Sequence, residues 1–350
     1  MENISQINKD YITNSKIKNR LQRFFIEYVM LLPTILLIIF GIFSSKYFLT
    51  ILNIQNLLIS ISIIGLLSLG AMFVMIFGEI DLSVGYLMVF SFFVSIKLQS
   101  LVGNIFDTKI LIQGTIFNGS QIVLAVGGIL IACLIGLING LGVVYGRINS
   151  FIMTLGMMGV LNGANFVLSK GKSFFLSRAE EFIKLGDTYI FKIIPLMTIV
   201  YIGIVISALI FLKLNVVGLR IYSVGSNRRA AMLAGINTKL WVIISFALSG
   251  FLAGIAGMFF QARSTFVDPK QGGNYAILAI AIAALGGTTL EGGEGNPLKV
   301  FIACLFLGTL LNILIIHGIS GWFQTAIVGV IIIVGFILNN MFKNYKNICI

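Results

Sequence analysis

Long apolar stretches alternate with short polar connections along almost the whole chain. Ten stretches are apolar enough to predict membrane-spanning helices, because such a helix needs about 20 mainly apolar residues. They cover residues 26–44, 54–77, 84–101, 121–144, 150–169, 191–212, 241–262, 274–287, 298–317 and 322–342. The eighth stretch is short for a full crossing and could be broken or partly re-entrant. The pattern predicts an all-α fold, a polytopic transmembrane bundle of about ten spans.

The polar segments predict one membrane domain with a tail at each end. Residues 1–24 are polar and basic, and this region is too long for the start of a signal peptide, so we expect a cytoplasmic N-terminal tail. The transmembrane domain covers 25–342, and 343–350 form a cytoplasmic C-terminal tail. Two connections inside the domain are long. We expect 169–192 on the outer, extracytoplasmic side of the membrane and 213–240 on the cytoplasmic side.

The composition agrees with a membrane protein. Of the 350 residues, 58% are hydrophobic and 10% are charged, whereas a soluble domain carries about 25% charged residues. So few charges could not cover a water-facing surface, which excludes an ordinary soluble enzyme, a disordered chain and a disulfide scaffold. The three cysteines are far apart and the single histidine, His317, lies near the end of an apolar stretch. We therefore expect no metal site and no catalytic residues.

The net charge of +12 bears on the orientation of the chain in the membrane. Lys and Arg are enriched in cytoplasmic loops, and their distribution favours a topology with both termini in the cytoplasm. No basic run is interleaved with exposed aromatic residues, so nucleic acid is not an expected partner. The partner that the basic loops suggest is the lipid bilayer.

The 213–240 connection contains a short run, NRRAAMLAG at 227–235, that predicts a helix. Ser226 or Asn227 would cap its start, and Gly235 would end it. Such a helix could rest at the lipid interface or dock into a groove of a soluble partner. The residues alone favour neither role.

Residues 78–85 read GEIDLSVG and place two carboxylates, Glu79 and Asp81, between two apolar stretches. A carboxylate at the bilayer centre costs about 2.5–3.5 kcal/mol and by default suggests function. The favoured interpretation is a cytoplasmic turn bracketed by Gly78 and Gly85, with Asp81 capping the next helix. No basic partner is expected nearby.

Residues 285–296 read LGGTTLEGGEGN and are rich in glycine. Glycine permits a positive φ and close approach of two backbones. The segment lacks the lysine of a phosphate-binding loop and the strand–helix context of a dinucleotide site. It therefore predicts a tight, closely packed re-entrant turn between the eighth and ninth stretches. The glycines concerned are Gly286, Gly287, Gly292, Gly293 and Gly295.

Five segments carry a family resemblance by their order and spacing. They are GEIDLSVG at 78–85, GRINSFIMTLGMMGVLNGANFVLSKG at 146–171, GLRIYSVGSNRRAAMLAGI at 218–236, SGFLAGIAGMFFQAR at 249–263 and LGGTTLEGGEG at 285–295. Together they resemble the membrane-spanning permease subunits of bacterial ABC importers for ribose, xylose, galactose and related monosaccharides. The resemblance covers most of the chain after the basic tail.

The resemblance implies a subunit of the bacterial cytoplasmic membrane that pairs with a second permease copy, as a homo- or heterodimer. It implies a cytoplasmic ATP-binding subunit and an extracytoplasmic sugar-binding protein as further partners. ATP and Mg would bind to the ATP-binding subunit, so this chain would bind no cofactor and would not be an enzyme. Transport would proceed by alternating access.

The resemblance also identifies 213–240 as the coupling loop, whose short helix the ATPase would move. The coupling residues would be Asn227, Arg228, Arg229, Ala230, Ala231, Leu233 and Gly235. The chain departs from the family at three positions: Glu79 replaces a usual glycine, and Ala276 and Leu278 stand where polar or acidic residues are common. The substrate-binding residues are not identified by the sequence.

Other functions are less well supported. A nucleoside, a branched-chain amino acid or a sugar-derived signal molecule is the alternative substrate within the same superfamily. An ion-coupled secondary transporter would need ionisable residues within its spans, where this sequence has almost none. An intramembrane enzyme would need a nucleophile with its base, or a metal cluster, and the sequence offers no such set.

Overall fold

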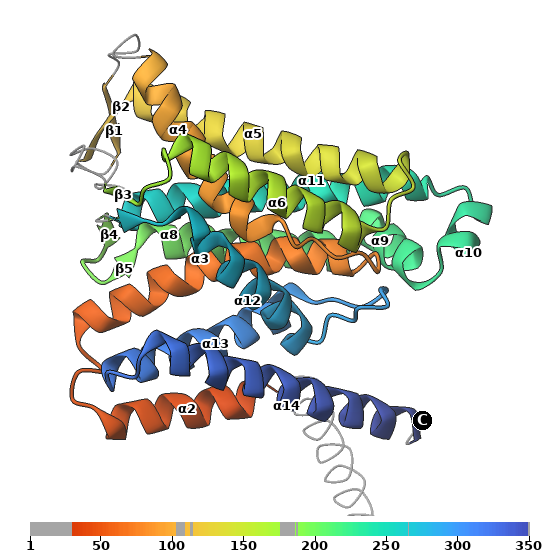
Figure 1. The fold of residues 1–350 in the computed structure, drawn as a ribbon. Helices are drawn as coiled ribbons and strands as arrows, with labels where there is room; N and C mark the ends of the chain where they lie inside the picture. The colour runs from red at the N-terminus through yellow and green to blue at the C-terminus, as the bar shows by residue number, and fades with distance from the viewer. Residues whose placement is uncertain are drawn as a thin grey trace, which may run out of the picture.

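The computed structural model describes residues 30–102, 109–112, 115–175, 186, 188–264 and 266–348 and forms a helical bundle (Figure 1). The predicted basic tail, residues 1–24, lies outside the described residues. The bundle helices are α2 (Leu31–Ser44), α3 (Ile51–Met75), α4 (Val84–Val102), α5 (Gly119–Val144), α6 (Ser150–Leu168), α8 (Leu196–Leu214), α11 (Thr238–Arg263), α12 (Gly272–Leu285), α13 (Pro297–Ile316) and α14 (Gly321–Ile348).

A helix lies in each of the ten apolar stretches, which confirms the prediction of an all-α polytopic membrane fold. In the described part of the chain, six helices are long and apolar enough to cross a membrane: α3, α5, α6, α8, α11 and α13. Shorter apolar helices lie in α2, α4 and α14. The α12 helix has 14 residues and is about 21 Å long, less than the roughly 30 Å of a bilayer core. The eighth stretch is therefore short, as predicted.

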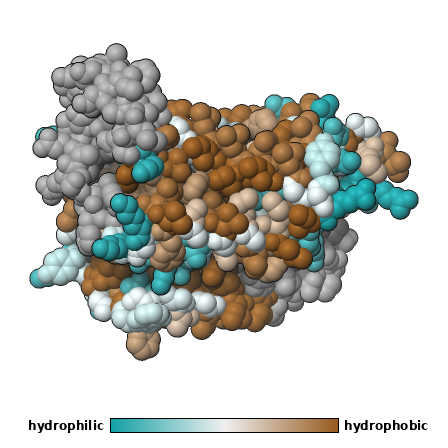
Figure 2. Space-filling view, turned by 45° about the horizontal axis from the view of Figure 1, so that its top comes forward, coloured by the Kyte–Doolittle hydropathy of each residue, from teal (hydrophilic) through white to brown (hydrophobic). Residues whose placement is uncertain are grey.

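The connections lie at two ends of the bundle (Figure 1). One end, here the α10 end, carries the connections 145–149, 215–237 and 286–296. The opposite end carries three antiparallel strand pairs among the described residues: β1 (Lys109–Ile112) with β2 (Thr115–Asn118), β3 (Phe174–Phe175) with β6 (Phe266–Val267), and β4 (Tyr189–Ile190) with β5 (Ile194–Pro195). In Figure 2, brown apolar side chains cover much of the face between the ends, and teal polar ones gather at the right, where Figure 1 has α10.

Several helix boundaries differ from the prediction: α14 continues to Ile348, into the predicted tail 343–350, and α3 starts three residues early, at Ile51. The start of α8 also differs, and it has an identifiable cause. The sixth stretch was expected to begin at residue 191, but α8 begins at Leu196. Ile194 and Pro195 instead pair with Tyr189 and Ile190 as a strand pair. Proline has no backbone N–H to donate and fixes its own φ, so it commonly stands at the start of a helix rather than within one.

The centre of the bundle is formed by α3 and α11. In their apolar windows, 78% of the α3 residues and 72% of the α11 residues are buried, against 17% for α6. Glycines let α5 approach α11 closely, since a Cβ on Gly250 would lie 2.3 Å from the carbonyl oxygen of Ala132. The α6 helix thus lies at the periphery and leaves most of its surface free.

Two helices start inside the bundle rather than at an end. After α3 the chain turns at Gly78, whose φ is +71°, and residues 79–83 are not helical before α4 begins. The short 3₁₀ turn η1 (Pro269–Gln271) leads into α12 in a similar way. The two starts touch, because a Cβ on Gly85 would lie only 2.0 Å from the carbonyl oxygen of Gly272. A side chain larger than hydrogen would force α4 and α12 apart.

Candidate functional site at the α10 end

The predicted short helix is present as α10 (Arg228–Leu233). Its cap is Asn227, whose side-chain oxygen accepts a hydrogen bond of 3.0 Å from the backbone N–H of Ala230. Ser226, the other candidate cap, is the last residue of the preceding helix. Gly235 follows the helix with a φ of +80°, a conformation that glycine adopts without strain. Both predicted ends of the helix are therefore confirmed, with Asn227 as the cap.

The sequence interpretation missed a second helix in the same connection, α9 (Val216–Ser226). Its cap is Asn215, which accepts a hydrogen bond of 3.0 Å from the N–H of Val217. An asparagine before a run of helix-compatible residues is the signal that could have identified it. The connection is thus a pair of helices that projects from the bundle (Figure 1).

Some side chains of α10 are buried against the rest of the protein, and others are exposed. Ala231 is buried, with 4% of its surface exposed, whereas Met232 and Leu233 are 59% and 83% exposed. Arg229 and Ala230 are exposed as well. Two large apolar side chains therefore stand free beside charged ones at the polar end of the molecule, an arrangement typical of a docking surface.

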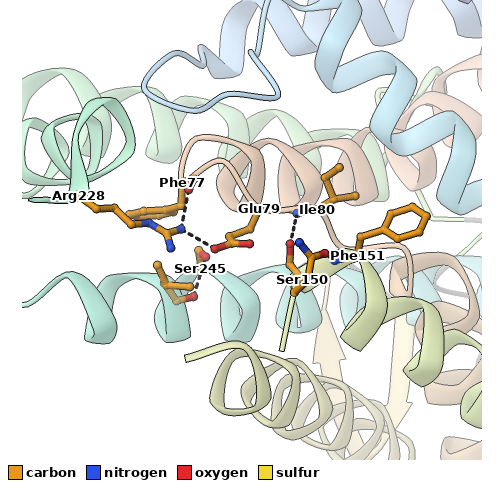
Figure 3. Close-up of polar contacts among 9 residues, drawn as sticks. Phe77, Glu79, Ile80, Ser150, Phe151, Arg228 and Ser245 are labelled. Carbon is orange, nitrogen blue, oxygen red and sulfur yellow. Dashed lines mark hydrogen bonds and ion pairs between the residues drawn. The ribbon is translucent and has the colours of Figure 1, made fainter. Parts of the chain in front are cut away.

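Glu79 has a basic partner that the sequence interpretation did not expect. The guanidinium of Arg228 donates a hydrogen bond of 2.6 Å to Oε1 of Glu79 and another of 2.7 Å to the carbonyl oxygen of Phe77 (Figure 3). The Arg228 side chain is 45% exposed and that of Glu79 is 12% exposed. The prediction that this motif lacks a basic partner is wrong, because the partner lies 149 residues further along the chain.

The non-helical segment 79–83 is held by α6. The N–H of Ile80 donates to the hydroxyl of Ser150 over 3.2 Å (Figure 3), and the N–H of Leu82 donates to the hydroxyl of Thr154 over 3.1 Å. A backbone group inside an apolar bundle is costly without a hydrogen-bond partner, and the two hydroxyls supply that partner. A chain of contacts therefore runs from α10 through Arg228, Glu79 and the 79–83 segment to α6.

Asp81 fixes the same segment to the interior of the bundle. Its Oδ1 accepts hydrogen bonds from the N–H and the hydroxyl of Ser83, over 3.0 and 2.6 Å, next to the first residue of α4. Its Oδ2 accepts one of 3.0 Å from Ser249 of α11. Asn139 of α5 donates to the Ser83 hydroxyl over 3.0 Å. The prediction that Asp81 caps α4 is not confirmed, because its carboxylate bonds to Ser83, the residue before the helix, and to Ser249 rather than to an N–H of α4. Asp81 is only 1% exposed and lies inside the bundle.

The glycine-rich segment 286–296 packs against the chain just after α3 and against α9. The N–H of Gly293 donates to the carbonyl oxygen of Ile76 over 2.8 Å, and the Tyr222 hydroxyl donates to the carbonyl oxygen of Gly295 over 2.6 Å. A phenol is protonated at neutral pH, and burial raises the pKa of the Tyr222 phenol further. The turn is closely packed as predicted, but it lies across the end of the bundle instead of re-entering it.

The predicted glycines have two roles. Gly78, Gly287, Gly292 and Gly293 have positive φ values, whereas Gly85, Gly286 and Gly295 have close neighbours that leave no room for a side chain. The three segments that the sequence singled out separately, 78–85, 227–235 and 285–296, therefore meet at the α10 end. Among the described residues, no group of three or more His, Cys, Asp or Glu side chains could hold a metal ion.

This architecture defines a polytopic membrane protein whose polar end carries a projecting helix pair linked to the bundle. Residues 53–335 match the family described as "Branched-chain amino acid transport system / permease component". The chain belongs to this family of transport permeases, and its relatives place it among the permeases of ABC sugar importers, as the resemblance implied.

Three relatives illustrate the similarity. The ribose import permease protein of Haemophilus influenzae is 32% identical over 330 residues, 93% of this chain and 96% of that protein. The ribose import permease protein of Bacillus subtilis is 33% identical, covering 87% of this chain and 89% of that protein. The L-arabinose ABC transporter permease protein of Azospirillum brasilense is 30% identical, with coverage of 85% and 83%. No solved structure matches the chain with significance.

Proposed function

We propose that the chain moves a monosaccharide across the bacterial cytoplasmic membrane, using ATP that is bound and hydrolysed by a separate partner subunit. The observation that carries the proposal is the nearly end-to-end similarity to import permeases for ribose and L-arabinose. A sugar is therefore a better supported substrate than the branched-chain amino acid named in the family description. ATP and Mg belong to the partner, and this chain binds no cofactor of its own.

The partner ATPase docks on α10. The exposed Met232 and Leu233 offer apolar contact area at an otherwise polar end of the molecule, and Arg229 adds an exposed charge. Large apolar side chains that face water on a short projecting helix contribute little to the stability of their own chain, and such exposed patches mark interaction sites. The groove of a soluble partner would cover them.

Movement of α10 reaches the bundle through the Arg228–Glu79 pair. Glu79 is covalently continuous with the segment 80–82, and that segment is hydrogen-bonded to Ser150 and Thr154. A displacement of α10 therefore pulls directly on the start of α6. Because α6 is the least buried of the six long apolar helices, it can shift with little repacking.

A second permease copy would pack near the free face of α6. Gly156, Gly159 and Gly163 lie on this helix with nothing within 4 Å of the position of a Cβ. Small residues spaced along an exposed transmembrane helix favour close packing of another helix. The substrate path would then lie between the two copies, where α6 can respond to α10.

The α10 end faces the cytoplasm in this proposal. Arg147, Arg220, Arg228 and Arg229 lie in the connections at this end and Lys239 lies in the first turn of α11, and basic residues are enriched in cytoplasmic loops. In Figure 1 the described chain ends at this side of the bundle, and α2 runs toward the opposite end, which supports a cytoplasmic location of both termini in this proposal. A sugar-binding protein would deliver its substrate to the opposite end.

Reconstitution tests the proposed function. The chain, co-purified with its ATPase in proteoliposomes and supplied with the binding protein, is expected to take up labelled ribose, arabinose or allose only when ATP is present. Labelled leucine is the matched control for the branched-chain amino acid alternative. Uptake by the purified chain alone, driven by a proton or sodium gradient, would show that the proposal is wrong.

A further inference from the structure

A groove of about 510 Å³ opens at the α10 end, between the α5–α6 connection and the start of α11. Its walls carry four charged side chains: Glu79, Arg147, Arg228 and Lys239. Figure 3 shows Arg228 and Glu79 turned toward each other on one side of this region. The groove therefore includes the Arg228–Glu79 pair in its lining but extends beyond it.

The charge of the groove is positive. Arg228 is compensated by Glu79 at 2.6 Å, whereas no carboxylate is paired with Arg147 or Lys239 in the described part of the chain. The nitrogen of Lys239 lies 5.7 Å from the centre of the Tyr145 ring. Arg147 has a φ of +53°, a conformation that non-glycine residues rarely adopt. Two cations thus stand at the groove, and no carboxylate among the described residues forms an ion pair with either of them.

Apolar side chains also line the groove. Val143, Val144, Ile148 and Val242 line it. A stripe of exposed apolar residues, spaced three or four apart on one face of α5, ends at Tyr145 just after the helix, and the ring of Tyr145 lies against the nitrogen of Lys239 in the groove wall. The stripe consists of Val126, Leu130, Leu134, Leu137, Ile138, Leu141 and Tyr145. A molecule lying along α5 would therefore reach the two cations with one end and remain on apolar surface with the rest.

We propose that this groove binds an anionic phospholipid. Its phosphate lies against Arg147 and Lys239, and its acyl chains follow the exposed stripe of α5. A basic pocket between transmembrane helices at a membrane surface has the chemistry that anionic headgroups require. Tyr145, with 66% of its surface exposed, is of a residue type that is enriched where membrane proteins meet lipid headgroups. The site is independent of the transported substrate.

Lipid titration of the full chain in detergent micelles tests the site. Native mass spectrometry would count bound phosphatidylglycerol and phosphatidylcholine of identical acyl chains, with no ATPase present. We expect the wild type to prefer phosphatidylglycerol, and each of Arg147→Gln and Lys239→Gln to weaken that binding about fivefold. Arg220→Gln, a matched loss of charge at the same end outside the groove, should leave it unchanged.

Three outcomes would overturn the site. The first is equal binding of the two lipids by the wild type. The second is undiminished phosphatidylglycerol binding by the Arg147→Gln/Lys239→Gln double variant. The third is displacement of phosphatidylglycerol by an equal concentration of inorganic phosphate, which would make the ligand a free anion. Because no sugar or ATP enters the experiment, the result does not depend on the proposed transport function.

Discussion

Arg228 of α10 donates a hydrogen bond of 2.6 Å to Glu79, which follows α3 in the chain, and so joins two segments 149 residues apart. This pair is the charged contact between the projecting helix and the segment that enters the bundle. The segment in turn is held by hydroxyls of α6. These contacts therefore connect the surface helix α10 to the peripheral bundle helix α6.

A double-mutant cycle measures the interaction between Glu79 and Arg228. Glu79→Gln and Arg228→Gln are expected to show a coupling free energy of about 1 kcal/mol in the free energy of unfolding, because the pair is only partly buried. Both single variants should lower sugar uptake more than ATP hydrolysis, since the ATPase still turns over while α6 no longer follows α10. The exchange Glu79→Arg/Arg228→Glu should recover part of the uptake. Full uptake in either single variant would contradict the role of the pair.

The exposed end of α10 is expected to carry the affinity for the ATPase. Leu233→Asp should weaken co-purification of the ATPase by at least about tenfold, because the lost apolar contact is replaced by a desolvated charge. Val216→Asp is the control, since Val216 is 65% exposed and begins α9, where an acidic residue favours a helix. Ala231, with 4% exposure, is unsuitable, because its replacement would disrupt the packing of α10 itself.

Cysteine labelling tests the orientation of the bundle. With Cys133, Cys304 and Cys349 replaced by alanine, Ser226→Cys should react with a membrane-impermeant maleimide only after the cells are opened. Phe191→Cys, at the opposite end and originally 86% exposed, should react in intact cells. The reverse pattern would invert the proposed topology without affecting the fold.

Replacement of the buried carboxylate should destabilise the protein according to the hydrogen bonds lost. Asp81→Leu leaves the donors of Ser83 and Ser249 without their acceptor, and each buried unsatisfied group costs about 1–3 kcal/mol. Asp81→Asn keeps one acceptor oxygen and should cost less. Thermal unfolding in detergent, followed by the reactivity of Cys304, which is 1% exposed, would rank the variants. Equal stability of both variants would mean that the hydrogen bonds contribute little.

The contact between the starts of α4 and α12 predicts a contrast between two glycines. Gly85→Ala would place a methyl group 2.0 Å from the carbonyl oxygen of Gly272, and overpacking of this kind costs about 1–3 kcal/mol. Gly156→Ala adds the same group to α6, where nothing lies within 4 Å. It should be neutral or slightly stabilising, because alanine favours a helix. Equal melting temperatures for the two variants would contradict the close approach of α4 and α12.

Local signals predicted the helices and most of their ends. Each long apolar stretch became a helix, because backbone groups in a bilayer must be satisfied within their own segment. Asn227 marks the start of α10 and Gly235 its end. Both act through residues close to them in the chain, so their roles could be predicted from the sequence. The signal for α9 is equally local, since Asn215 caps the helix through the N–H of Val217, two residues along.

Features that depend on distant segments could not be predicted in this way. The partner of Glu79, the burial of Asp81 against Ser249, and the groove between Arg147 and Lys239 each join parts of the chain that are far apart. By itself the sequence determined a polytopic helical membrane protein, since membrane insertion and helix capping depend on neighbouring residues. Only the tertiary structure decided how its three motifs meet, because their contacts depend on how the helices pack against one another.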